Sequence, residues 1–443
     1  MIKKPIILAA AAGLVLAALL GFRYGSKREA VKQPPLRLAG EGARPKTPGD
    51  RLVLAAQGLV EREPEAARGY RMLAAAYMQK ARETGDFSLN AKSDEALARA
   101  EQVEPGGYDS LKLRAKLLLT YHRFAEALEA ARRAQSVNPR DHDNYGAMAD
   151  ALVELGDYDG AVAAAQAMVD LRPDTASYSR VSYLRELHGD TKGAVEAMRV
   201  AVEAASPKDP EGAAWCRVHL GDALARGGDA AGAEREYDHA LYVFPDYHAA
   251  LAAKARARLA AGDADAAAGF YRRAIERVPL PDYAAALGDL LTKLGRADEA
   301  RRQYELVEFV ERGGAQGGTY TRQLATFWAD HDTRLDEALA VARGERAARG
   351  DIYTDDLLAW CLHKKGLHAE AKASMDEALR LGTRDPRLLF HAGLIAEALG
   401  DRAAAANYLR QALAVNPSFD VLQADAARRA LARVSHGDTG ARL

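Results

Sequence analysis

Residues 142–175 read HDNYGAMADALVELGDYDGAVAAAQAMVDLRPDT and set out the plan of the whole chain. Apolar side chains recur at spacings of three and four residues, first over 145–152 and then over 161–168. This spacing places each set on one face of a helix. Gly156 interrupts the first helix and Pro173 ends the second. The stretch therefore predicts two short amphipathic helices joined by a tight turn.

The same plan recurs along the chain at a fixed interval. Pro105, Pro139, Pro173 and Pro207 follow one another at a spacing of 34 residues. Self-similarity at this period is typical of repeat solenoids. A pair of helices this small cannot bury its apolar face alone, so neighbouring pairs must stack on one another. The sequence therefore predicts one elongated body instead of a globule with a central core.

Small side chains mark the points where the helices are expected to cross. A larger side chain there would be overpacked, at a cost of roughly 1–3 kcal/mol. The small residue of the first helix recurs as Ala115, Ala149, Gly221, Ala255, Gly288, Ala359 and Gly393. The alanine that opens the second helix recurs as Ala127, Ala161, Ala233, Ala267, Ala300, Ala371 and Ala405.

These positions resemble the tetratricopeptide repeat, which favours a bulky residue, then Leu, Gly or Ala, an aromatic residue, Ala and Pro at set places. The resemblance covers about residues 50–434. In unit 248–281 the first helix departs from this pattern and the second fits it well, and a further example is unit 386–419. The latter supplies Leu389, Ala392, Gly393, Ala396, Ala405, Leu409, Ala412 and Pro417. The resemblance implies an all-α, right-handed superhelical solenoid of about ten stacked antiparallel helix pairs.

Composition excludes several classes of function. The 443 residues carry a net charge of −1, which gives no indication of a nucleic-acid surface. The two cysteines, Cys216 and Cys361, form no pattern for a zinc or redox site. No nucleophile–base pair or paired-acid pocket stands outside the repeats. We therefore expect no enzyme activity, no cofactor, no metal and no small-molecule substrate.

The N-terminus differs from everything after it. Residues 5–22 form a run without charge behind Lys3 and Lys4, which predicts a signal anchor or a cleaved signal peptide over 1–22. A linker rich in Pro, Gly and basic residues follows over 23–49. We expect attachment to a bacterial inner membrane with the repeats on the periplasmic side. The alternatives are release into the periplasm after cleavage, and a cytoplasmic side favoured by the basic residues after the run.

The repeats show four irregularities. Residues 50–66 resemble half a unit and predict a starting cap. About seven extra residues over 79–93 predict an insertion that lengthens one end of the helix hairpin and forms a ledge, with the second helix resuming at Glu95. Four glycines over 313–318 predict a joint; they lack the Lys-Ser or Lys-Thr of a phosphate-binding loop. Residues 419–434 predict a capping helix, followed by a flexible tail over 435–443.

The resemblance also implies where a ligand binds, namely the concave face lined by the first helix of each pair. That face predicts a mixed-charge groove for an extended or helical segment of a partner protein. The alternative is a solvated face whose aspartates bond across to neighbouring repeats. Lys112 and Lys116 could grip a carboxylate, whereas Trp360 and Tyr353 could be anchors or could pack between units. The candidate groove residues are Arg71, Lys112, Lys116, Asp150, Tyr183, Asp222, Arg256, Asp289, Arg322, Tyr353 and Trp360.

Taken together, the sequence favours a non-catalytic scaffold or adaptor that binds partner proteins at the bacterial cell envelope. One alternative is an assembly factor for a pilus, a polysaccharide-export system or an outer-membrane machine. Another is a non-catalytic subunit of an enzyme complex. From the sequence we also expect reversal of the charges of Lys112 and Lys116 to weaken partner capture without lowering thermal stability.

Overall fold

The computed structural model describes residues 47–314 and 321–436, which are helical almost throughout. Within these residues there are 22 helices and no strand. Their bounds are α2 (Pro48–Arg62), α3 (Ala67–Thr84), α4 (Leu89–Val103), α5 (Tyr108–Thr120), α6 (Phe124–Val137), α7 (His142–Leu155), α8 (Tyr158–Leu171), α9 (Thr175–Leu187), α10 (Thr191–Glu203), α11 (Pro210–Arg226), α12 (Ala230–Val243), α13 (His248–Ala260), α14 (Ala264–Arg277), α15 (Pro281–Lys293), α16 (Ala297–Gly314), α17 (Arg322–Asp330), α18 (Leu335–Ala348), α19 (Ile352–Lys364), α20 (His368–Ala378), α21 (Pro386–Ala398), α22 (Arg402–Val415) and α23 (Gln423–His436).

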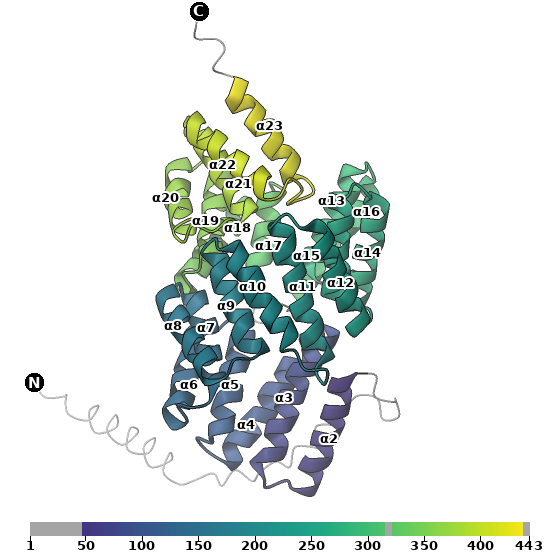
Figure 1. The fold of residues 1–443 in the computed structure, drawn as a ribbon, viewed down its shortest axis with the longest axis vertical. Coiled ribbons are helices and arrows are strands. Elements are labelled where there is room, and N and C mark those ends of the chain that lie inside the picture. The colour runs from purple at the N-terminus through teal and green to yellow at the C-terminus, as the bar shows by residue number, and fades with distance from the viewer. Residues whose placement is uncertain (1–46, 315–320, 437–443) are drawn as a thin grey trace, which may run out of the picture. The chain divides into compact units, whose positions relative to one another are not determined.

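The helices from α3 to α22 form ten antiparallel pairs, and each pair packs against the next in chain order (Figure 1). The single helices α2 and α23 cover the two ends of the stack. This arrangement confirms the all-α solenoid and the expected number of units. In each pair we call the odd-numbered member the first helix and the even-numbered member the second helix.

Side chains from the second helix fill the space that small residues leave on the first helix. A Cβ atom added to Gly221 or Gly288 would overlap the ring of Tyr237 or Tyr304, respectively. At Gly393 the added atom would lie 2.7 Å from Leu409 Cγ. The small residue is thus required because the two helices cross in close contact at that point.

The structure confirms the expected lengthening of the hairpin at 79–93, shows no ledge, places the start of the second helix before Glu95, and locates the other irregularities. The extra residues lengthen α3 to Thr84, and α4 already begins at Leu89, so only a short turn separates the two helices. The starting cap is α2, whose N-cap Thr47 forms a capping box with Asp50. Helix α16 continues to Gly314, and residues 315–320 lie outside the described part.

The membrane prediction falls outside the described residues, because these begin at residue 47. Among the helices that are described, none combines the length and the apolar character that a bilayer crossing requires.

Helices far apart in sequence also meet along a lateral seam. The turn that ends α7 contacts the segment between α18 and α19: the Gly350 amide donates to the Glu154 carbonyl at 3.1 Å. Arg349 forms an ion pair with the Glu154 carboxylate at 3.0 Å, and the Tyr158 hydroxyl accepts from the Ile352 amide at 2.9 Å. The third repeat is thereby fixed to the eighth and ninth.

Glycine makes this close approach possible. Gly156 has φ of 80°, in the left-handed region, and a Cβ atom there would overlap the carbonyl oxygen of Gly350. Gly189 stands in the same relation to the carbonyl of Gly382. Gly262 has an almost identical φ of 83° but nothing within 4 Å of an added Cβ atom. Glycine is therefore required at the seam for two reasons. It adopts the left-handed backbone conformation, and it leaves space for the backbone on the other side of the seam.

This comparison predicts different effects for two Gly→Ala substitutions. Gly262→Ala should lower the free energy of unfolding by about 1 kcal/mol, which is the usual effect of Ala in a left-handed conformation. Gly156→Ala should lower it by about 2–3 kcal/mol, because the methyl group must also displace the backbone across the seam. Urea denaturation followed by circular dichroism measures both values. Equal losses in the two variants would show that the seam contributes nothing to stability.

Candidate functional site

The predicted groove residues lie on the first helices, on the side that we call the inner face. Most of them bond to the first helix of the next repeat, to the segment just before it, or to the end of their own second helix. Arg71 pairs with Glu104 at 2.7 Å, and Asp150 binds the Arg180 guanidinium through both oxygens at 2.8 and 2.6 Å. The inner face is therefore crossed by a series of inter-repeat bonds, which we call the ladder.

Two aspartates of the ladder also bond within their own repeat. Asp222 accepts from the Tyr237 hydroxyl and from Arg256 of the next repeat, both at 2.8 Å. Asp289 accepts from the Tyr304 hydroxyl at 2.8 Å and lies 2.7 Å from His331 Nε2. Each tyrosine is the one that packs against the glycine preceding its aspartate. In each case the glycine packs against the second helix of its own repeat, and the adjacent aspartate bonds to the next repeat.

The C-terminal repeats continue the ladder. Arg322 donates to Asp351 at 3.0 Å, and the Trp360 indole donates to Asp330 at 2.8 Å. Trp360 is only 3% exposed and its ring stacks on His391, with 4.0 Å between ring centroids. Of the two roles considered for this tryptophan, the structure shows packing between units.

Lys112 and Lys116 bind the start of the following repeat. Lys112 lies 2.5 Å from Asp141 and 3.3 Å from Asp143, while Lys116 lies 3.1 Å from Asp143. Burial tends to raise the pKa of Asp141, but Lys112 and the Tyr108 hydroxyl outweigh it and hold the pKa at about 2. Both lysines are thus engaged in holding two repeats together.

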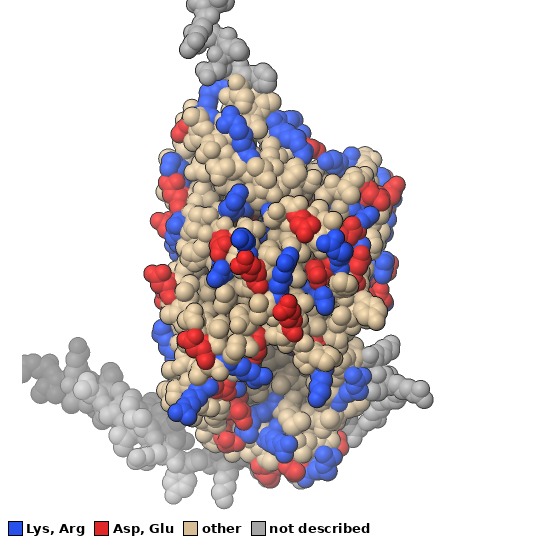
Figure 2. Space-filling model, viewed as in Figure 1, with Lys and Arg blue, Asp and Glu red and all other residues tan. Residues whose placement is uncertain are grey.

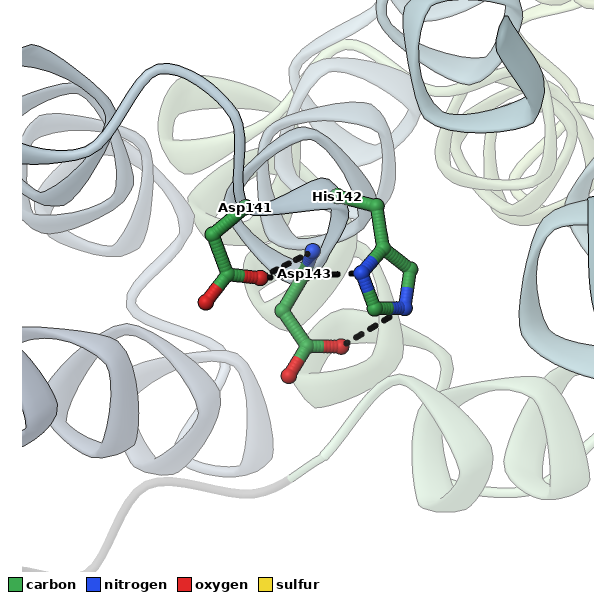
Figure 3. A group of neighbouring side chains, drawn as sticks. All are labelled: Asp141, His142 and Asp143. Carbon is green, nitrogen blue, oxygen red and sulfur yellow. Dashed lines mark hydrogen bonds and ion pairs between the residues drawn. The ribbon is translucent and has the colours of Figure 1, made fainter. Parts of the chain in front are cut away.

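Asp141, His142 and Asp143 are the one group of described residues whose donor atoms lie close enough to hold a metal ion (Figure 3). Figure 3 shows the His142 ring beside the two carboxylates, with one ring nitrogen 3.6 Å from Asp141 and the other 3.7 Å from Asp143. Both carboxylates are also ion-paired with lysine. The group therefore acts as an inter-repeat ion-pair network in this structure, and we assign it no ligand.

Three aromatic residues on the inner face stand apart from the ladder. Tyr183 on α9 is 40% exposed, and Trp215 on α11 is 38% exposed with its ring 3.9 Å from that of His219. Removal from bulk water raises the pKa of Tyr183, and so do Glu154 and Asp351. The pKa of Tyr353 on α19 is also raised by burial, with Tyr183 among the nearby groups. Glu186 raises the pKa of both tyrosines.

Sequence reasoning missed Arg226, Asp282 and Arg387. Arg226 lies four residues after Asp222 on one face of α11 and pairs with Glu186 at 2.5 Å, so helical spacing could have identified it. The pKa of Asp282 is raised by removal from water, although Arg387 and other arginines counteract this. No sequence signal relates Asp282 to Arg387, because α15 and α21 are far apart in the chain.

The outer surface gives little indication of a partner. Figure 2 shows acidic and basic side chains interspersed over the face drawn there. One cleft of about 780 Å³ lies between α10, the end of α11 and the end of α22, and its rim carries both signs of charge. The inner face is therefore the better candidate, because it combines exposed aromatic rings with a rigid scaffold.

Comparison with known proteins supports the repeat assignment. A model of the tetratricopeptide repeat matches residues 147–210 and 219–281, and a second one matches residues 386–419. The chain therefore contains tetratricopeptide repeats. No curated protein matches the chain in sequence.

Several solved structures are similar to the chain. A tetratricopeptide repeat protein from Parabacteroides merdae ATCC 43184 is 18% identical over 59% of this chain and 98% of its own, with a TM-score of 0.34. The type IV pilus biogenesis factor PilW is 17% identical over 49% of this chain and 97% of its own, with a TM-score of 0.39. Human IFIT1 with PPP-AAAA is 14% identical over 75% and 78%, with a TM-score of 0.47. We draw no functional argument from likeness at this level.

The lysine contacts change the result expected for charge reversal. Lys112→Glu should lower the free energy of unfolding by about 2 kcal/mol, because it places a third carboxylate beside Asp141 and Asp143 in a site where the lysine is 19% exposed. Lys116→Glu should cost less than about 1 kcal/mol, since that lysine is 43% exposed. Chemical denaturation of both variants tests this order. Unchanged stability in Lys112→Glu would contradict a structural role and favour the binding role.

The low pKa of Asp141 predicts a pH dependence. Asp141→Asn keeps the N-cap acceptor for the Asp143 amide but removes the charge that Lys112 binds. At pH 7 the variant should be less stable by about 1–2 kcal/mol. The folded pKa is depressed from 3.8 to about 2, so this stability is lost as pH falls between those values. The unfolding free energies of wild type and Asp141→Asn, measured at pH 7, 4 and 2, should therefore differ at pH 7 and converge toward pH 2. A difference that does not change with pH would contradict the predicted role of the Asp141 charge.

Proposed function

We propose that this tetratricopeptide-repeat chain is a non-catalytic scaffold that binds a segment of a partner protein along its inner face. The observation that carries the proposal is the pair of exposed aromatic side chains, Tyr183 and Trp215, on a face where the predicted charged residues are mostly paired within the chain. Aromatic residues that combine exposure with a rigid setting are favoured anchors in protein interfaces. The ladder supplies that rigidity, because it joins each first helix to its neighbours.

The rigid setting matters for affinity. Binding costs less conformational entropy when the receiving surface is already ordered. The Arg226 guanidinium bonds to Glu186 of the preceding repeat, three residues from Tyr183, and it lies on the same face of α11 as Trp215. These bonds hold the backbone beneath both rings. A partner segment would therefore meet a preformed surface.

The cellular location in this proposal comes from the sequence. The apolar run over residues 5–22 supports placement at the bacterial cell envelope. We propose that residues 23–46 tether the repeats to the membrane and leave the inner face open to partners.

An experiment with a matched control tests the binding face. Full-length chain is crosslinked in intact membranes and purified together with its partners, as wild type and as Tyr183→Ala/Trp215→Ala. The control is Tyr242→Ala, which removes an aromatic ring that is 86% exposed on the second helix α12. We expect partner recovery to fall at least about tenfold in the double variant, the loss typical of a central anchor, and to stay unchanged in the control.

The outcomes separate the alternatives. Equal recovery in all three proteins would contradict inner-face binding and direct attention to the outer helices. Circular dichroism and thermal melting confirm that the double variant remains folded. The identity of the recovered proteins then distinguishes a general scaffold from an assembly factor or from the non-catalytic subunit of an enzyme.

A further inference from the structure

The seam recurs at a constant distance along the chain. The hydrogen bond between Arg349 and Glu154 spans 195 positions. The close approach of Gly189 to Gly382 joins residue numbers that differ by 193. A superhelix of regular pitch produces such an interval wherever one turn lies against the next. The seam is therefore contact between two successive turns, and Figure 1 shows α18, α19 and α20 above α7 and α8.

A third contact lies at the N-terminal end of the seam. Gly85 caps the end of α3, and Val278 caps the end of α14. Their residue numbers again differ by 193, and a Cβ atom added to the glycine would overlap the valine side chain. Beside them Arg82 forms an ion pair with Glu211 at 3.6 Å. The first turn thus touches the second at the first, third and fourth repeats.

The C-terminal end of the superhelix is held in a similar way. Lys293, the last residue of α15, donates to the Asp425 carboxylate of α23 at 2.7 Å and to the Val421 carbonyl at 3.3 Å. The Val421 side chain is buried in one apolar cluster with Leu251 and Leu287, which belong to the sixth and seventh repeats. The capping helix and the segment before it are therefore fixed to repeats more than a hundred positions earlier.

These contacts limit the routes to the inner face. Tyr183 and Trp215 are exposed to water, so an open space lies in front of them. Where the turns meet at the seam, a partner cannot reach this space sideways. The cleft between α10 and α22 also lies between the turns, but its volume of about 780 Å³ is that of a small-ligand pocket. The routes that remain run lengthwise, through the two ends of the superhelix.

The inner side chains themselves indicate an enclosed space that holds water. Tyr183 is 40% exposed, yet removal from bulk water raises its pKa. Asp282 in the first turn of α15 is also exposed, and removal from bulk water raises its pKa too. A side chain on an open convex surface is not desolvated in this way. Both residues therefore contact water while protein surrounds them on several sides.

We propose that the wound repeats enclose the inner face as a channel, and that this channel takes a free end of a partner polypeptide, inserted lengthwise. The inference rests on the proposed function and specifies the form of the partner. A folded domain is excluded, because the turns would have to separate to admit it. A loop held at both ends by folded domains is disfavoured, since it must enter as a double strand. A single extended strand or helix is the narrowest form of polypeptide and enters without unwinding the repeats.

The test compares access to an inner and an outer cysteine in full-length protein. Asp282→Cys places a thiol on the first helix α15, and Asp265→Cys places one on the second helix α14. Both positions are exposed and lie in the first turn of their helices. The native thiols of Cys216 and Cys361 are buried, so wild type measures the background reaction.

Three maleimide probes differ in bulk. The first is N-ethylmaleimide, and the second is a linear Gly-Ser peptide with the maleimide at its free end. The third is the same peptide with a globular protein fused to each end and the maleimide at its centre. We expect the first two probes to label both cysteines at similar rates. The third should label Asp282→Cys at least about tenfold more slowly than Asp265→Cys, because that reaction requires the turns to separate.

Two results would overturn the proposal. Equal labelling of the two cysteines by the third probe would show that the inner face is open from the side. Exclusion of the linear peptide from Asp282→Cys would show that the channel is too narrow for a chain end or already filled.

A further variant relates the exclusion to the seam. Glu154→Ala/Arg349→Ala, added to Asp282→Cys, removes an ion pair that joins the two turns. Labelling by the third probe should then rise at least about threefold, while circular dichroism shows that the chain remains folded. The control is Arg343→Ala/Glu370→Ala, an ion pair between two exposed side chains on second helices, which should leave labelling unchanged. Equal labelling in the two variants would show that the seam does not close the channel and would overturn the proposal.

Labelling and partner capture fail independently of each other. Equal labelling by the third probe, together with partner capture that depends on Tyr183 and Trp215, would overturn this inference and leave the proposed scaffold in place. Selective labelling together with partner capture that ignores both rings would overturn the proposed function, and with it the assignment of a partner's chain end to the channel.

Discussion

Close contact between the two helices of each repeat is the constraint on which the rest of the structure depends. A ring such as that of Tyr237 occupies the space above Gly221, and Tyr304 does the same above Gly288. Because the rings lie flat against the first helix, their hydroxyl groups reach Asp222 and Asp289. These aspartates are thereby oriented toward the next repeat. Packing inside one unit thus fixes the polar contact that joins it to its neighbour.

Two kinds of long-range contact build on this foundation. The ladder runs from one first helix to the next and gives the inner face a fixed geometry. The seam joins the end of α7 to the segment before α19, where Gly156 and Gly350 come into backbone contact. A solenoid held only by nearest neighbours can bend along its whole length. Contacts such as Arg349–Glu154 restrict that freedom between the third and the ninth repeat.

Most charged residues of the inner face serve this architecture, which narrows the candidate site to what remains. Lys112, Asp150 and Arg322 all have partners within the chain. Tyr183 and Trp215 do not belong to the ladder, and they combine exposure with a rigid backbone. A surface of this kind suits recognition of an extended segment, because affinity comes from a few anchors and specificity from charge.

The sequence by itself determined the helix pairs, their number and the residues at which they cross, because these follow from local spacing repeated at a constant period. It also located the face on which the candidate site lies. Only the tertiary structure decided which inner-face residues are already bonded within the chain: Lys112 bonds to a carboxylate 29 positions away, and Asp150 bonds to a guanidinium 30 positions away. The seam at Gly156 belongs to the same class. These long-range contacts depend on the sum of the small rotations between successive repeats, and no local pattern of residues encodes that sum.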